Sequence, residues 1–168
     1  MANTYIAIAT VTVGSGGAAN IEFTSIPGTY TDLLIKTSVR GDTAATATAL
    51  LATFNGSTAN FTSRFLEGNG SGANSYTSPS NILGGTTAAS ATSSTFSNIE
   101  IYIPNYAGSN NKSVSADSVT ENNATAAYVD LIALLWSNSA AITSIKLSPN
   151  AGNFVQYSTA TLYGIKNT

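Results

Sequence analysis

A period of two in the hydrophobic pattern constrains the fold of this chain more than any other feature. In residues 158–166, STATLYGIK, Thr and Tyr side chains alternate with Ala, Leu and Gly. In residues 95–104, TFSNIEIYIP, three isoleucines fall on one face. Strands place successive side chains on opposite faces, so this alternation indicates strands with one buried face. Helical periodicity is nearly missing, and the pattern therefore predicts an all-β protein.

Breaks rich in Gly, Asn and Pro separate the alternating segments at short intervals. Such spacing is typical of an antiparallel β-sandwich or closed barrel. We expect a jelly-roll-like sandwich of about eight to ten strands, forming one domain over residues 1–168. Since strand signals begin close to Met1 and end two residues before Thr168, we expect a free-standing module. The expected strands are 4–13, 21–25, 32–41, 48–56, 61–70, 95–104, 112–122, 125–137, 142–150 and 158–166.

Four segments carry more specific expectations. Residues 68–95 are rich in Ser, Gly, Ala and Asn, which predicts a long polar loop that is either functional or mobile. The polar segment 112–122 is expected at a sheet edge or facing a neighbour. Residues 125–137 fit either a helix or a strand, and their Tyr, Val, Ile and Trp content favours a buried central strand. The last strand, 158–166, is expected between two neighbours.

Charge is scarce, and this narrows the range of partners. Only 8% of residues are charged, compared with about 25% in typical domains, and the net charge is -2. With six basic residues the chain has no phosphate-binding stripe, so we expect no nucleic-acid partner. No run of about 18 apolar residues or signal peptide is recognisable, so we expect no membrane span. A hydrophobic content of 43% excludes disorder on compositional grounds.

The residue types needed for most catalytic and metal sites are missing. Without His or Cys, the chain cannot form Ser-His or Cys-His pairs or thiolate zinc sites. Asp117, Glu121 and Asn123 offer oxygen ligands suited to calcium, but turn and edge-strand chemistry explains them better. We predict no catalytic, cofactor-binding or metal-binding residue. A glycosidase would need two facing carboxylates among eight that show no local pair: Glu22, Asp32, Asp42, Glu67, Glu100, Asp117, Glu121 and Asp130.

Three tyrosines stand apart from the other aromatic residues. Most aromatics lie in alternating runs, and Trp136 ends the most apolar stretch, so we expect them in the core or on sheet faces. Tyr76, Tyr106 and Tyr157 instead lie among small polar residues in expected loops or strand ends. These three are our candidates for contacts with a glycan or at a subunit interface.

Four segments resemble a family of small proteins encoded among the structural genes of tailed bacteriophages, marine ones especially. They are FTSIPGTYTDLLI (23–35), TFSNIEIYIPNY (95–106), ENNATAAYVDLIALLWSNSAAITSIKLSP (121–149) and NFVQYSTATLYGIK (153–166). The resemblance implies an all-β virion component of the capsid or tail, assembled in the host bacterial cytoplasm. It carries no catalytic motif and no cofactor.

The expected function is therefore that of a non-enzymatic virion structural protein. It would decorate the capsid or form part of the tail, in contact with other virion proteins. We expect a homo-oligomer, with a trimer favoured by the resemblance to phage appendages. The alternative is a receptor- or glycan-binding module of a tail fibre or surface appendage. A carbohydrate-active enzyme on a β-sandwich is a third, less supported reading.

Overall fold

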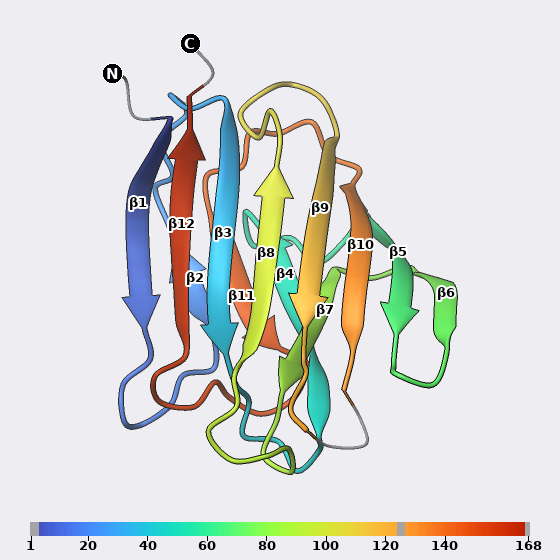
Figure 1. Ribbon diagram of the computed structural model, residues 1–168. Helices are drawn as coiled ribbons and strands as arrows, with labels where there is room; N and C mark the ends of the chain where they lie inside the picture. The colour runs from blue at the N-terminus through green and yellow to red at the C-terminus, as the bar shows by residue number, and fades with distance from the viewer. Residues whose placement is uncertain (1–3, 124–126, 167–168) are drawn as a thin grey trace.

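The computed structural model describes residues 4–123 and 127–166, and within them the regular structure is entirely β (Figure 1). Twelve strands form two antiparallel sheets, one of eight strands and one of four. None of the described residues belongs to a helix, so no helix capable of crossing a membrane is found among them. The strands are β1 (Tyr5–Thr12), β2 (Ile21–Phe23), β3 (Asp32–Val39), β4 (Ala47–Phe54), β5 (Phe61–Gly68), β6 (Ala73–Ser78), β7 (Ile82–Thr87), β8 (Ser97–Ile103), β9 (Lys112–Val119), β10 (Val129–Trp136), β11 (Ile145–Pro149) and β12 (Thr159–Ile165).

Eight of the strands form a jelly roll. The large sheet begins with the order β1-β12-β3-β8, and the small sheet has the order β2-β11-β4-β7. The antiparallel pairs of these strands are nested one inside another along the chain. β1 pairs with β12, β2 with β11, β3 with β8, and β4 with β7. Nested pairs of this kind are a long hairpin rolled into two sheets, which is the jelly-roll architecture. The predicted all-β, jelly-roll-like sandwich is confirmed.

Two insertions widen the large sheet beyond its partner. The β5–β6 hairpin is inserted between β4 and β7, and the β9–β10 hairpin between β8 and β11. They join through the β5–β10 pairing and continue the large sheet in the order β9-β10-β5-β6. Figure 1 shows β5 and β6 at the end of this sheet opposite β1. The insertions raise the strand number above the expected eight to ten.

The core lies between the two sheets and is built from the inward residues of each alternating strand. β8 has the burial pattern expected from its sequence, with Ile99, Ile101 and Ile103 fully buried. Beneath the wider part of the large sheet, Trp136 lies within 6.0 Å, centroid to centroid, of Phe54 and Phe61. Trp136 is 1% exposed, which confirms the expected burial of this ring.

Two of the expectations for individual strands are confirmed. β12 lies between β1 and β3, so the last strand is inserted between neighbours as expected. The segment 125–137 contains β10, a central strand between β9 and β5, and the helical alternative is wrong for Val129–Trp136. Residues 125 and 126 of that segment lie outside the described residues.

Two other expectations are wrong. Residues 68–95 are not one long polar loop, because they contain β6 and β7. After β7, the chain turns around Arg40, whose guanidinium donates hydrogen bonds to the carbonyl oxygens of Ala89, Ala91, Thr92 and Thr95 at 2.8–3.3 Å. The polar segment 112–122 is not at an edge either, since β9 lies between β8 and β10. Two of its four inward residues, Lys112 and Ser118, are polar, so the sequence of this buried strand resembled that of an exposed one.

Candidate functional site

The three candidate tyrosines do not gather at one site. Tyr76 is on β6 and is 44% exposed, whereas Tyr157 is 68% exposed in the segment before β12. Tyr106 is fully buried, and its hydroxyl donates a hydrogen bond to the carbonyl of Pro27. The prediction that Tyr106 contacts a glycan or a neighbour is therefore wrong, because its ring fills the core beneath the β8–β9 connection. Only Tyr76 lies in a cleft with polar groups.

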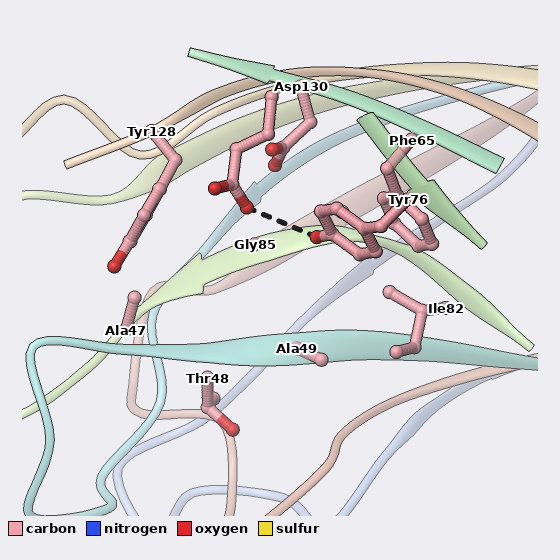
Figure 2. Close-up of a pocket in the computed structure, with 11 residues that line it drawn as sticks. Ala47, Thr48, Ala49, Phe65, Tyr76, Ile82, Gly85, Tyr128 and Asp130 are labelled. Carbon is pink, nitrogen blue, oxygen red and sulfur yellow. Dashed lines mark hydrogen bonds between the residues drawn. The ribbon is translucent and has the colours of Figure 1, made fainter. Parts of the chain in front are cut away.

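That cleft opens where the small sheet ends and the large sheet continues. β4 and β7 form one wall, and the inward face of β5, β6 and the start of β10 forms the other (Figure 2). We call it the β5–β7 cleft. Its volume is about 210 Å³, and it is lined by Ala47, Thr48, Ala49, Phe65, Glu67, Tyr76, Ile82, Gly84, Gly85, Tyr128 and Asp130.

Two carboxylates meet in the cleft on neighbouring strands. Asp130 of β10 is directly opposite Glu67 of β5 in the antiparallel register. Asp130 occupies an inward position of its strand and is only 6% exposed. Burial, with a further contribution from the negative charge of Glu67, raises the pKa of Asp130 to about 6. A hydrogen bond with Ser118 opposes this rise in pKa by favouring the carboxylate.

Two tyrosines flank the carboxylates. The Tyr76 hydroxyl donates to Glu67 Oε2 at 3.1 Å, and the Tyr76 ring stacks on Phe65 with a centroid separation of 4.6 Å. Burial and the bond to Glu67 raise the pKa of Tyr76 to about 12, so this hydroxyl stays protonated. On the other side Tyr128 is held by its backbone, which exchanges two hydrogen bonds of 2.9 Å with Thr120. Figure 2 shows Tyr76 and Tyr128 on opposite sides of Asp130.

The cleft has a uniform electrostatic character. Its described lining contains two carboxylates and two phenols but no lysine or arginine. The walls formed by β4 and β7 carry only small or apolar side chains and Thr48. Such a site can accept hydrogen bonds and attract positive charge, but its described lining offers no cationic side chain to bind an anion.

Sequence reasoning identified Tyr76 but missed Asp130, Glu67 and Tyr128. The available signal was an aspartate in the apolar run YVDLIALLW, at a position that alternates with Ile132, Leu134 and Trp136. A charge on the buried face of a strand is unusual and often functional. Glu67 could not be linked to it without knowing that β5 pairs with β10.

A second notable surface is the outer face of the widened sheet. Leu66 and Leu131 are cross-strand partners there, as are Val119 and Val129, and Leu135 continues the row along β10. These five side chains, which we call the outer apolar patch, are 37–60% exposed. Adjoining apolar side chains on an exposed sheet face often mark an interaction surface.

The proposed oxygen cluster of Asp117, Glu121 and Asn123 has no common site. Asp117 is exposed on the outer face of β9, and Glu121 Oε1 accepts a 2.8 Å hydrogen bond from the backbone N–H of Asn123. This is the local turn chemistry that the sequence favoured. Among the described residues no group of three or more acidic side chains is arranged to hold a metal ion.

Comparisons of the chain with protein-family models, with curated proteins and with solved structures give no match. The features of the molecule that bear on its function are therefore the jelly roll, the outer apolar patch and the β5–β7 cleft.

Proposed function

We propose that the protein is a non-enzymatic structural subunit of a bacteriophage virion, located on the capsid surface or in the tail. It associates with copies of itself and with other virion proteins after synthesis in the host cytoplasm. The observation that carries this proposal is the outer apolar patch, where Leu66, Val129 and Leu131 are each more than half exposed. Burying this patch against a partner would remove apolar surface from water, which favours association.

The chemistry around the patch suits self-association. Interface cores are depleted in charge, and only 14 of 168 residues here are charged. Two copies can therefore come together without burying many unpaired ions. The large sheet also ends in β6, a strand that is exposed along nearly its whole length. Association would cover such an edge, which natural proteins seldom leave open.

The fold and the sequence resemblance point in the same direction. Jelly rolls are a common architecture of viral capsid domains, although lectin domains share it. A trimer is the oligomer that the resemblance favours. In a trimer the outer apolar patch would contact a different surface of the next subunit, whereas a twofold dimer would bring two patches together.

Light scattering of the purified protein tests the association. We expect an oligomer at micromolar concentration and dissociation when Leu131→Asp places a charge in the patch. Ser38→Asp is the matched control, because Ser38 is exposed on the same face of the large sheet, on β3. A wild-type monomer, or equal behaviour of the two variants, would contradict association through the patch.

Immunogold electron microscopy of phage particles that carry the protein tests the location. Labelling of intact capsids or tails would support the proposed role. Absence of the protein from purified particles would refute it, whatever its oligomeric state in solution.

A further inference from the structure

The β5–β7 cleft holds negative charge that no cation of the described chain neutralises. Neither Asp130 nor Glu67 has a lysine or arginine nitrogen within 4.0 Å, since the one ion pair among the described residues joins Lys36 to Glu100. Charged side chains are seldom this buried unless they are paired. The 6% exposure of Asp130 therefore calls for a positively charged group from outside the chain.

We propose that the β5–β7 cleft binds an alkylammonium group, as carried by a lysine side chain or a polyamine. The ammonium would lie between Asp130 and Glu67, and its alkyl chain would run along the small side chains of β4 and β7. This site is independent of the outer apolar patch, because it lies on the inward face of the same strands.

The aromatic walls favour an organic cation over a metal ion. Tyr76 and Tyr128 lie on opposite sides of Asp130, and tyrosine rings attract ammonium groups through their negative faces. Calcium instead prefers six to eight oxygen ligands, more than two carboxylates provide. Ala47, Ala49 and Ile82 add apolar surface that suits methylene groups and would contribute nothing to a metal site.

The carboxylates are held in place before any ligand arrives. Ser118 Oγ accepts a 2.9 Å hydrogen bond from Gly85 N–H, and Ser118 is directly opposite Asp130 in the β9–β10 register. Gly85 allows β7 to approach this closely, because a Cβ at that position would lie 2.7 Å from Cγ2 of Thr120. Glu67 is fixed by Tyr76. A preorganised site loses less entropy on binding.

Binding of a cation should depend on pH through Asp130. The titratable groups that face it are Glu67 from β5, Tyr76 from β6 and Tyr128, while β4 and β7 contribute none to the described lining. A cation favours the ionised carboxylate, whose pKa in the free protein is about 6. Affinity should therefore rise between about pH 5 and about pH 7.5, with release of a proton on binding at the lower pH.

Two-dimensional NMR titration tests the proposal on the full chain. The probes are N-acetyl-lysine-methylamide and spermidine, with N-acetyl-norleucine-methylamide as the uncharged analogue and calcium chloride as the metal probe. We expect the amine probes to shift the Gly84 and Gly85 amides, and the uncharged analogue and calcium to leave them in place. Tighter binding of the lysine derivative would indicate a protein partner, and tighter binding of spermidine a free polyamine.

Asp130→Asn should weaken amine binding at neutral pH by about tenfold or more, as expected for removal of a buried charge from an ion pair. Glu22→Gln is the control, because Glu22 is an exposed carboxylate on β2. The NMR spectrum of each variant shows whether it is folded. Should Asp130→Asn not fold, Tyr76→Leu provides a second variant, with the same expected direction.

The proposal would be overturned by the absence of shifts with both amines, by equal shifts with the uncharged analogue, or by unchanged amine affinity in both cleft variants. Calcium binding at Gly84 and Gly85 that the amines cannot displace would overturn it as well.

Discussion

At the scale of single residues, Arg40 holds the turn after β7 in place. Its guanidinium is buried and donates to four backbone carbonyls between Ala89 and Thr95. Arg40→Met would leave these carbonyls without their donor, so we expect a loss of about 3 kcal/mol in the free energy of unfolding. Urea denaturation measures the loss.

Arg64→Met is the matched control for this prediction. Arg64 is exposed on β5, where its guanidinium bonds to the hydroxyl of Thr77. We expect a change within about 0.5 kcal/mol for this surface substitution. Similar losses in both variants would show that the carbonyl contacts of Arg40 have no special weight.

Asp130 should make stability depend on pH in a defined direction. Its pKa is about 6 in the folded protein, compared with about 3.9 for an aspartate in an unfolded chain. The folded state therefore binds this proton more tightly, and the resulting stabilisation is complete below about pH 3.9 and is lost as the pH rises through about 6. Relative to Asp130→Asn, the wild type should lose free energy of unfolding across this window.

Urea denaturation of the two proteins at several pH values measures this difference. Comparison with Asp130→Asn removes the contribution of the other carboxylates, which both proteins share. A difference that stays constant between about pH 4 and about pH 7 would contradict the raised pKa.

Gly164 is required by the packing of one ring. A Cβ at this position of β12 would lie 2.4–2.5 Å from three ring atoms of Tyr30, including Cγ, so the whole ring would have to move. We expect Gly164→Ala to lower the free energy of unfolding by about 2 kcal/mol through overpacking. Gly14→Ala is the control, since nothing lies within 4 Å of its added Cβ. Equal melting temperatures for the two variants would refute the steric argument.

At the scale of elements, the β6 end of the large sheet should be less stable locally than its middle. β6 pairs only with β5 and five of its six residues are exposed, whereas β12 is paired on both sides. Exposed edges with few buried contacts open at low free energy. Hydrogen exchange by mass spectrometry should show faster exchange for residues 73–78 than for residues 159–165. Equal protection would contradict this and would indicate that another strand covers β6.

The elements also show why some strands could be predicted from the sequence and others could not. β8 and β12 alternate between apolar inward and polar outward residues, so local pattern was sufficient. β6, ANSYTS, is exposed on both faces and has no hydrophobic alternation to detect. β9 pairs with its neighbours along the chain, β8 and β10, but its inward residues include Lys112 and Ser118, so its local pattern did not indicate a buried strand.

The candidate site was less predictable than the fold for the same reason. Tyr76 drew attention because it lies among small polar residues, and Tyr106 did so equally. The two tyrosines differ in burial. Tyr106 lies in the core and its hydroxyl donates to the carbonyl of Pro27, whereas Tyr76 stacks on Phe65 at the open edge of the large sheet. Asp130 and Glu67 become neighbours only when two inserted hairpins pair. Sequence alone gives the residue types, but tertiary pairing decides which of them meet.

On the scale of the whole molecule, both candidate surfaces arise from the widening of a jelly roll. The nested strands from β1 to β12 form the frame, and the β5–β6 and β9–β10 insertions extend one sheet past the other (Figure 1). The extension exposes the outer apolar patch on one face and leaves the β5–β7 cleft on the face that the small sheet covers only partly. A rigid frame with functional insertions is a common way for one fold to serve different tasks.

The whole molecule should also be insensitive to salt. The one ion pair among the described residues, Lys36 to Glu100 at 2.8 Å, is exposed on both sides, and such pairs contribute little to stability. The buried cations Arg40 and Lys112 are bonded to backbone carbonyls, whose dipoles salt does not screen effectively at short range. We therefore expect the urea midpoint to be the same at low and at molar sodium chloride, and Glu100→Gln to leave it unchanged. A marked fall in the wild-type midpoint with salt would show that charge pairs stabilise the fold more than this sparse set allows.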